Sequence, residues 1–205
     1  MIEPGNVFVI SAPSGTGKTT LVNTLVDHIP RITVSVSHTT REQRPAETNG
    51  INYFFVSEPE FERMVRLHEF LEHAIVFHHS YGTSHRWVEE TLKQGIDVIL
   101  EIDWQGCQQI RRLFPHAVSI FILPPSITAL AQRLKQRNQD SLTVIEQRLA
   151  DFQETTKHMS EYDYIVINDD FQSAVSDLTH IVLASRLVRH RQLNKVVRII
   201  KHDVE

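Results

Sequence analysis

Residues 11–19 read Ser11-Ala12-Pro13-Ser14-Gly15-Thr16-Gly17-Lys18-Thr19. This stretch lies between an apolar run, residues 7–10, and a segment, residues 19–28, in which Leu and Val recur at helical spacing. A strand, a glycine-containing loop and a helix in this order are the context that a phosphate-binding P-loop needs. Glycines let successive backbone N–H groups point inward, and the start of the helix adds a positive dipole. The stretch therefore predicts a binding site for a di- or triphosphate.

Two side chains of this loop have expected roles. Lys18 would reach the β- and γ-phosphates, and the Thr19 hydroxyl would help to hold Mg²⁺. Ala12 stands where the strict pattern has glycine; its side chain is small, but it disfavours positive φ. An ordinary turn is the alternative, and a Gly-Lys-Thr sequence that opens a periodic helix argues against it. The residues expected to bind the triphosphate are Ser11, Ala12, Pro13, Ser14, Gly15, Thr16, Gly17, Lys18, Thr19 and Thr20.

The composition of the chain is that of a globular α/β protein. Its 205 residues are 41% hydrophobic and 22% charged, which suits one domain with an inserted piece. No run approaches the ~18 apolar residues of a membrane span, and residues 1–5 lack the features of a signal peptide. The single cysteine, Cys107, cannot form an internal disulfide, so we expect a cytoplasmic protein. The net charge of −4 argues against nucleic acid as a partner.

Strand-like apolar runs alternate with helix-like patterns along most of the chain. We expect strands over residues 7–10, 32–36, 98–102, 118–123 and 164–167, and helices over residues 19–28, 84–94, 105–113, 126–137 and 142–158. This alternation predicts βαβ units and therefore a parallel sheet covered by helices on both faces.

Two regions interrupt the alternation. One begins polar at residue 37 and then contains short aromatic and apolar runs, with a capping-box pattern at Ser57 and Glu60; it predicts a small insert that contains a sheet. The other holds two helical segments joined by polar residues, which predicts a mobile lid. We therefore divide the single domain into a core (1–34, 84–124 and 164–205), an insert (35–83) and a lid (125–163).

A second phosphate site is indicated by Arg41 and Arg44, which follow a strand in a polar loop. Guanidinium groups match phosphate oxygens bidentately, and the hydroxyls of Tyr53 and Tyr81 could add donors. The alternative is that these arginines are ordinary solvated surface residues.

Glu72 is a candidate for recognition of a purine base. A carboxylate beside a base-sized cleft can accept two parallel hydrogen bonds, which guanine offers from N1–H and its 2-amino group. Adenine presents an acceptor at N1 instead. The alternative is an exposed strand residue.

Two carboxylates, Glu101 and Asp103, end the third main strand, where α/β sheets place ligands. Asp103 could position Mg²⁺ or its waters; the alternative is a helix N-cap.

Three further features carry weaker signals. His68 and His73 are five residues apart, which does not match zinc-ligand spacing on a helix, and Cys107 is interpreted as a small helix residue rather than a nucleophile. Residues 178–202 contain no Asp or Glu and six Lys or Arg. We interpret them as a final helix with a solvated basic end, or as an oligomer contact or a site for an anionic partner, so a monomer and a homo-oligomer both remain open.

The chain resembles the guanylate kinases, which transfer the γ-phosphate of ATP to GMP. The matching segments follow the family order over residues 7 to about 185, at residues 12–19, 35–44, 49–53, 69–72, 81–83, 102–106, 124–126 and 168–170. The resemblance implies a three-layer P-loop kinase fold with a GMP-binding insert and a helical lid. It also implies ATP and GMP as substrates and Mg²⁺ as the cofactor.

The resemblance assigns roles to individual residues. Guanine recognition falls to Ser37, Glu72 and Thr83. The GMP phosphate falls to Arg41, Arg44, Tyr53 and Tyr81. The GMP ribose and the metal waters fall to Glu101 and Asp103. Contacts with the transferring phosphoryl group and the adenine are assigned to Lys18, Arg41, Arg133, Arg137, Arg148 and Asn168. Two departures are His38, where many members have Ser, and residues 78–80, where the family often has a Gly-Asn-Tyr run.

Two alternative functions remain at this point. A related P-loop kinase acting on ribose 1,5-bisphosphate would keep the phosphate loop but would not need Ser37 and Glu72 for a base. A non-catalytic binding module could dispense with Lys18, Thr19 and Arg41, and all three are present. The acceptor in a guanylate kinase is already an anionic phosphate, so we expect positioning and charge neutralisation rather than a general base.

Overall fold

A parallel five-stranded sheet forms the centre of the computed structural model, which describes residues 3–136 and 142–202. The strand order is β2-β7-β1-β8-β9, and every neighbouring pair is parallel. The strands are β1 (Val7–Ser11), β2 (Ile32–Val34), β7 (Asp97–Leu100), β8 (Val118–Leu123) and β9 (Tyr164–Ile167). This arrangement confirms the predicted fold class.

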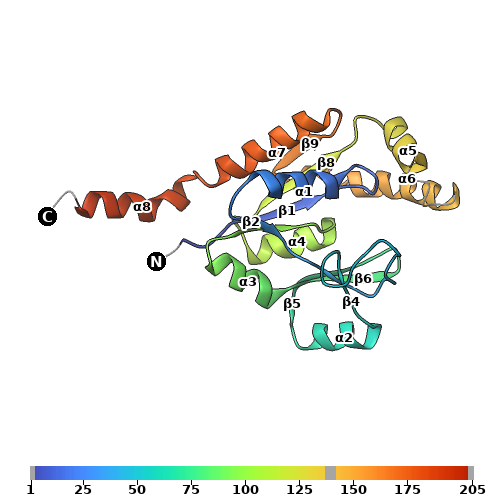
Figure 1. The fold of residues 1–205 in the computed structure, drawn as a ribbon, viewed down its shortest axis with the longest axis horizontal. Coiled ribbons are helices and arrows are strands. Elements are labelled where there is room, and N and C mark those ends of the chain that lie inside the picture. Colours follow the sequence, from blue (N-terminus) through green and yellow to red (C-terminus); the bar gives the residue numbers. More distant parts are fainter. Residues whose placement is uncertain (1–2, 137–141, 203–205) are drawn as a thin grey trace.

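Helices cover both faces of this sheet (Figure 1). Because side chains alternate along a strand, Phe8 and Ile10 of β1 pack against α1 (Lys18–His28) and α7 (Phe171–Ser185). Val7 and Val9 point to the opposite face. There they join a core with α3 (His85–Lys93) and α4 (Trp104–Leu113). The continuous apolar run of β1 is buried throughout, as a central parallel strand requires.

The insert is a second, four-stranded sheet with one helix (Figure 1). Its strand order is β4-β3-β6-β5, and its elements are β3 (His38–Thr39), β4 (Phe54–Phe55), α2 (Glu58–Arg66), β5 (Phe70–Val76) and β6 (His79–Ser84). The predicted cap of α2 is present, since the Ser57 side chain accepts a hydrogen bond from the Glu60 backbone N–H at 3.4 Å. Strand β6 was not predicted.

The lid region consists of α5 (Ile127–Gln136), α6 (Leu142–Thr156) and a short 3₁₀ helix (Met159–Glu161). Leu130, Leu134 and Ile145 give it a small core of its own. After α7 the chain forms α8 (Arg189–His202), which projects away from the body (Figure 1). The expected final helix is therefore two helices. Within the described ranges, none of the helices combines the length and the apolar character needed to cross a bilayer.

Candidate active site

The phosphate loop has the backbone shape that its glycines predict. Gly15 and Gly17 have φ values of 92° and 93°, a region that favours glycine. Ala12 is not among the described non-glycine residues with positive φ, so its departure from the strict pattern causes no strain. Helix α1 begins at Lys18 with no acidic residue in its first turn and no side-chain cap. Its first N–H groups are therefore available to an anionic ligand.

Residues distant in the sequence hold this loop in place. The buried carbonyl of Thr16 accepts hydrogen bonds from Asn168 Nδ2 at 2.6 Å and from Arg133 Nη1 at 3.4 Å. Arg133 Nη2 also donates to the Asn168 carbonyl at 2.9 Å. A Cβ at Gly17 would lie 2.8 Å from Asn168 Nδ2, so the close fit of this residue requires glycine. The structure thus brings two of the residues assigned to the ATP side against the loop.

A third residue of the ATP side, Arg148 on α6, donates from Nη1 to Ser14 Oγ at 2.8 Å. Arg137 lies outside the described residues. Lys18 is half-buried, and in the described ranges its ammonium makes no ion pair or hydrogen bond with protein, which leaves it available for phosphate. Thr19 and Thr20 are exposed at the start of α1.

A cavity of about 240 Å³ opens beside the loop. It lies at the carboxyl end of the sheet, where parallel strands present ligands. Its walls come from the loop, the lid and the segment after β9: Thr16, Gly17, Thr20, Arg133, Asn168, Asp169 and Phe171.

The two carboxylates after β7 differ in their surroundings. Asp103 is the N-cap of α4: its Oδ1 accepts from the Gly106 backbone N–H at 3.0 Å, and its Oδ2 accepts from Gln105 Nε2 at 2.9 Å. The N-cap alternative is therefore what the structure shows, and it leaves further lone pairs on both oxygens. Glu101 Oε1 is buried and has no hydrogen-bond partner among the described residues. Both side chains are half-buried close to β1, the strand that precedes the phosphate loop. Ser11 Oγ, at the end of β1, donates a hydrogen bond to the Ile102 carbonyl at 2.6 Å.

Glu72 is buried in the insert, so the exposed-strand alternative is wrong. Its side chain is 3% exposed, and Thr83 Oγ1 donates to Glu72 Oε1 at 2.5 Å. Burial is the largest cause that raises the pKa of Glu72, to about 7; the hydrogen bond from Thr83 opposes this shift and the charge of Asp103 adds to it. The pair predicted to recognise a base is thus preassembled on neighbouring strands β5 and β6.

Arg41 is positioned by an acid that the sequence analysis missed. Its Nη2 lies 2.7 Å from Glu47 Oε1, and the two side chains are only 13% and 16% exposed. The guanidinium also lies over the rings of Tyr53 at 5.4 Å and Phe55 at 5.7 Å. The pattern around Glu47 contains no signal for this pairing, because a loop carboxylate six residues away is common by chance. Arg41 is consequently not a free surface arginine.

Three of the other residues assigned to the GMP phosphate lie near this pair: Tyr53, Tyr81 and Arg44. The ring of Tyr81 meets the ring of Tyr53 edge-on at 5.9 Å. Burial raises the pKa of Tyr53 to about 12, so its hydroxyl stays a donor. Ser37 is half-buried in the segment that joins β2 to β3, and Arg44 is exposed. In the described part of the chain, the Arg44 guanidinium has no ion pair.

A second missed residue is Gly106, in the first turn of α4. A Cβ there would lie 2.4 Å from Glu72 Oε2, so only glycine lets the buried carboxylate approach the helix. A glycine inside a helix lowers helix stability. The presence of glycine in the first turn of this helix was therefore the sequence signal that could have identified the position.

Three features with weaker sequence signals can also be located in the structure. Among residues 3–136 and 142–202, no group of three or more His, Cys, Asp or Glu could hold a metal ion. Cys107 is buried in α4, and burial raises the pKa of its thiol to about 11, which makes it unreactive. At the family departure near residue 78, Phe77 and His78 form the turn between β5 and β6 with φ values of 48° and 67°.

Comparisons with known proteins agree with this geometry. The family model for guanylate kinase matches residues 5–185. The guanylate kinase of Coxiella burnetii is 53% identical over 204 residues, which cover 100% of this chain and 99% of that protein. The guanylate kinase of Alcanivorax borkumensis is 55% identical over 193 residues, which cover 94% and 93%. The crystal structure of guanylate kinase from Anaplasma phagocytophilum has a TM-score of 0.80 and 31% identity, and the match covers 96% of this chain and 95% of that one. The chain therefore belongs to the guanylate kinase family.

Proposed function

We propose that this chain phosphorylates GMP with ATP to give GDP, with ATP on the phosphate loop and GMP against the insert. The buried Glu72–Thr83 pair is the observation that carries the proposal (2.5 Å). A carboxylate in this position can accept from N1–H and the 2-amino group of guanine, whereas adenine would leave it facing an acceptor. Ser37 then addresses O6 of the same base.

The GMP phosphate would be held by Arg41, Arg44, Tyr53 and Tyr81. Two observations support this: the guanidinium of Arg41 lies over aromatic rings that also carry hydroxyl donors, and Arg44 is exposed beside it. Because Glu47 already pairs with Arg41, a substrate phosphate would have to share or replace that partner. Bidentate guanidinium contacts suit both anions.

Catalysis in this proposal consists of alignment and charge neutralisation. The acceptor oxygen belongs to a phosphate that is already anionic, so no general base is assigned. Lys18 and the lid arginines Arg133 and Arg148 would neutralise the transferring group, and Arg137 would join them from outside the described residues. Contacts from the lid to Thr16 and Ser14 support this role, because they place both guanidiniums at the phosphate loop.

The residues at the loop fit a magnesium ion held largely by phosphate and water. Mg²⁺ prefers oxygen ligands and keeps several waters. The Thr19 hydroxyl would bind it directly, and the carboxylates of Asp103 and Glu101 would hold its waters. One buried oxygen of Glu101 has no partner in the part of the chain that the structure describes. When bound, this ion neutralises the β- and γ-phosphate oxygens.

A coupled assay that detects diphosphate product tests the proposal. Purified protein is given ATP and Mg²⁺ with GMP, dGMP, AMP or ribose 1,5-bisphosphate in parallel. We expect turnover with GMP and dGMP and at least about 100-fold lower kcat/KM with AMP, since the wrong base leaves a buried carboxylate unpaired. Preferred use of the bisphosphate, or a folded protein that makes no GDP, would overturn it.

A further inference from the structure

An aromatic pair joins the end of the lid to helix α4 of the core. The rings of Trp104 and His158 are stacked, with centroids 3.7 Å apart and an angle of 3° between their planes. Trp104 is the first residue of α4, and His158 follows α6 by two residues, just before the 3₁₀ helix. The catalytic roles proposed above use neither ring, so this contact requires an explanation of its own.

The imidazole of His158 is also held by Glu161. His158 Nδ1 lies 2.7 Å from Glu161 Oε1, and Gln108 Nε2 on α4 donates to Glu161 Oε2 at 2.8 Å. Only 20% of the His158 side chain is exposed. Because a ring that is hydrogen-bonded at its edge cannot turn freely, the stack is kept in one orientation. The end of the lid is therefore attached to α4 at two points, through the indole and through Gln108.

Helix α4 is itself held against the insert, so it gives the stack a rigid base. Gln109 exchanges two hydrogen bonds with the backbone of His73 on β5, at 3.2 and 2.9 Å. Gln105 Nε2 donates to the Ile75 carbonyl at 3.3 Å and to Asp103, which caps the helix. The start of α4 thus carries both the acid proposed to hold the metal waters and the indole that receives the lid.

Helix α6 connects the stack to the phosphate loop. Arg148 lies in the middle of α6 and donates to Ser14 Oγ at 2.8 Å, and His158 follows the end of the same helix. Asp151 lies between them: burial raises the pKa of its carboxyl, and the charge of Asp103 adds to this shift, so α6 passes close to the start of α4. Because backbone hydrogen bonds make a helix stiff along its axis, fixing its end also fixes where the Arg148 guanidinium lies.

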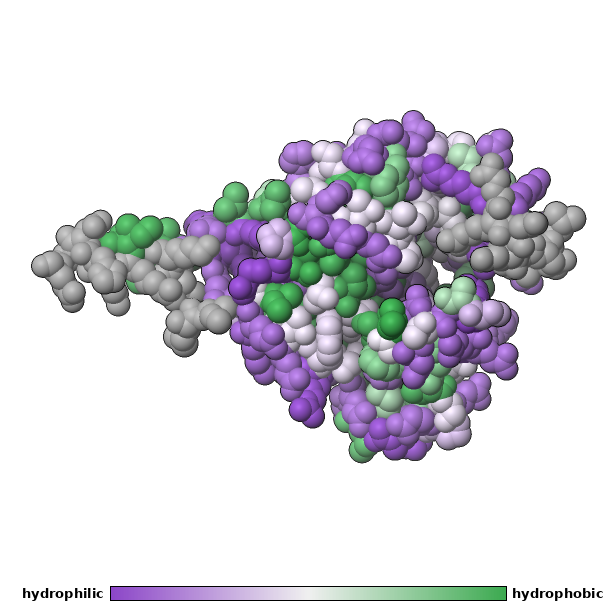
Figure 2. Space-filling model, viewed as in Figure 1, coloured by the Kyte–Doolittle hydropathy of each residue, from purple (hydrophilic) through white to green (hydrophobic). Residues whose placement is uncertain are grey.

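We propose that Trp104 and His158 are positioning residues for phosphoryl transfer, whose stack anchors the end of α6 and thereby keeps Arg148 at the phosphate loop. This inference rests on the proposed function, in which Arg148 neutralises the transferring group. The lid has a small core of its own, and the surface is hollowed between the lid and the insert (Figure 2). Its contacts with the body therefore decide where the lid lies relative to the loop.

A purely structural role for the stack is the alternative. Trp104 and His158 are both half-buried, so their contact removes less apolar surface from water than a pair in the core would. A stacked pair does constrain both the distance and the tilt of its two partners. We therefore expect its loss to alter the direction in which α6 leaves the core more than the stability of the fold, and the tests below measure turnover for this reason.

A double-mutant cycle tests whether the stack acts through Arg148. His158→Ala should lower kcat for GMP about tenfold, the upper range for loss of an aromatic pair. The KM for GMP should stay nearly unchanged, because the proposed GMP contacts are in the insert. In an Arg148→Ala background the same substitution should have little further effect. Trp104→Leu removes the stack from the other side and should repeat these results in the coupled assay.

A conservative variant and the fluorescence of the indole separate the stack from the fold as a whole. His158→Phe keeps a flat ring against Trp104 and should restore most of the turnover that His158→Ala loses. The chain has two tryptophans, so Trp87→Phe leaves Trp104 as the only indole. In that background His158→Ala should shift the emission to longer wavelength and increase quenching by acrylamide, because the covering ring is gone.

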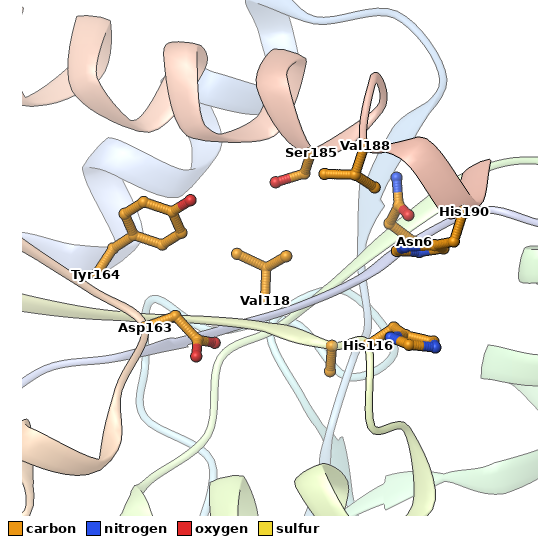
Figure 3. Close-up of a pocket in the computed structure, with 9 residues that line it drawn as sticks. Asn6, His116, Val118, Asp163, Tyr164, Ser185, Val188 and His190 are labelled. Atoms are coloured by element: carbon orange, nitrogen blue, oxygen red, sulfur yellow. The ribbon is translucent and has the colours of Figure 1, made fainter. Parts of the chain in front are cut away.

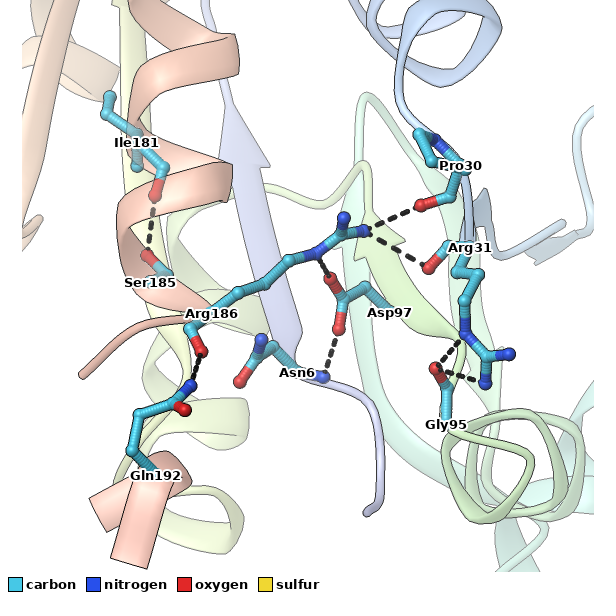
Figure 4. A network of polar contacts seen from close by, with 9 residues as sticks. All are labelled: Asn6, Pro30, Arg31, Gly95, Asp97, Ile181, Ser185, Arg186 and Gln192. Carbon is cyan, nitrogen blue, oxygen red and sulfur yellow. Dashed lines mark hydrogen bonds and ion pairs between the residues drawn. The ribbon is translucent and has the colours of Figure 1, made fainter. Parts of the chain in front are cut away.

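His116→Ala is the matched control, because it removes another stacked ring pair that lies away from the phosphate loop. His116 and His190 stack with centroids 4.4 Å apart beside a cavity of about 300 Å³, where β8 and β9 begin (Figure 3). Helix α8 carries His190 and stays attached without this stack, since Gln192 bonds the Arg186 carbonyl and Arg186 bonds Asp97 (Figure 4). The control should keep normal kcat and an unchanged emission maximum.

Three results would overturn this inference while leaving the proposed function in place. They are an unchanged kcat in His158→Ala, an effect of His158→Ala that multiplies with that of Arg148→Ala, and a failure of His158→Phe to restore turnover. If His158→Ala does not fold, the Trp104→Leu cycle decides by the same criteria. A wild-type protein that makes no GDP would overturn the proposed function, and this inference with it.

Discussion

The phosphate loop and the insert are each proposed to bind a phosphate, but they are built from different parts. The loop uses main-chain N–H groups, two glycines with positive φ and one lysine. The insert uses side-chain pairs: Thr83 with Glu72, and Glu47 with Arg41. Main-chain groups are the same in every residue, so we expect the loop to accept any polyphosphate tail. A side-chain pair can distinguish one base from another, so we propose that the Glu72–Thr83 pair gives the insert its specificity.

The largest effect is expected when Lys18, the one cation of the loop, is removed. Lys18→Ala should lower kcat at least about 100-fold, because a charge-stabilising donor to the transferring group is lost. The coupled assay measures it at saturating ATP and GMP. Lys93→Ala, at an exposed lysine of α3 paired with Glu89, is the control and should keep normal turnover. Near-normal turnover of the Lys18 variant would show that the loop works through its backbone alone.

A smaller effect is expected in the insert, and it should change selectivity rather than turnover. Glu72→Gln replaces one acceptor oxygen with a donor that would face the donors of guanine, so GMP binding should weaken by about 10–100-fold. AMP binding should change little, and calorimetric titration of both nucleotides measures the ratio. Glu69→Gln, at a half-buried acid paired with Arg63 on α2, is the control. An unchanged GMP-to-AMP ratio would remove Glu72 from base recognition.

The acidity of Glu72 gives a third prediction. Its pKa rises from an ordinary 4.5 to about 7, so the folded protein binds this proton more tightly than the unfolded chain. The resulting contribution to stability is present below pH 4.5 and is lost as the pH rises through 7. In the proposed recognition, guanine requires the ionised form, so affinity for guanosine should rise about tenfold from pH 6 to pH 8.

Guanosine is the right probe for this measurement because it lacks the phosphate that would titrate in the same range. Its inhibition constant against GMP, followed over that pH range, should be flat in Glu72→Gln. A pH dependence that persists in this variant would assign the titration to another group.

The smallest effect is expected at Glu47, the acid that forms an ion pair with Arg41. Glu47→Gln should lower KM for GMP about threefold, because the substrate phosphate then no longer competes with a carboxylate for the guanidinium. Steady-state kinetics at fixed ATP measure it. Glu42→Gln in the same loop is the control, since only its backbone carbonyl contacts Arg41. A raised KM would mean that Glu47 orients Arg41 more than it competes for it.

The contrast between the phosphate loop and the insert also explains which features could be predicted from the sequence. The central strands and the phosphate loop follow from apolar runs and glycine spacing, because local pattern and fold agree there. Strand β6 was missed because His79–Ser84 is polar and lacks alternation; its pairing with β5 and β3 makes it a strand. The Arg41–Glu47 pair depends on how a loop folds back, which no spacing encodes. The division between α7 and α8 was missed because apolar residues continue through Leu187 and Val188.

The hydrogen bonds to the Thr16 carbonyl have a consequence for protein engineering. The donors come from residues 133 and 168, more than 100 positions away along the chain. A nine-residue graft of the loop onto a foreign scaffold would leave those anchors behind. The graft would keep the sequence of the loop but would lose the contacts that hold its backbone conformation. It should therefore bind nucleotide weakly unless both anchoring residues are grafted with it.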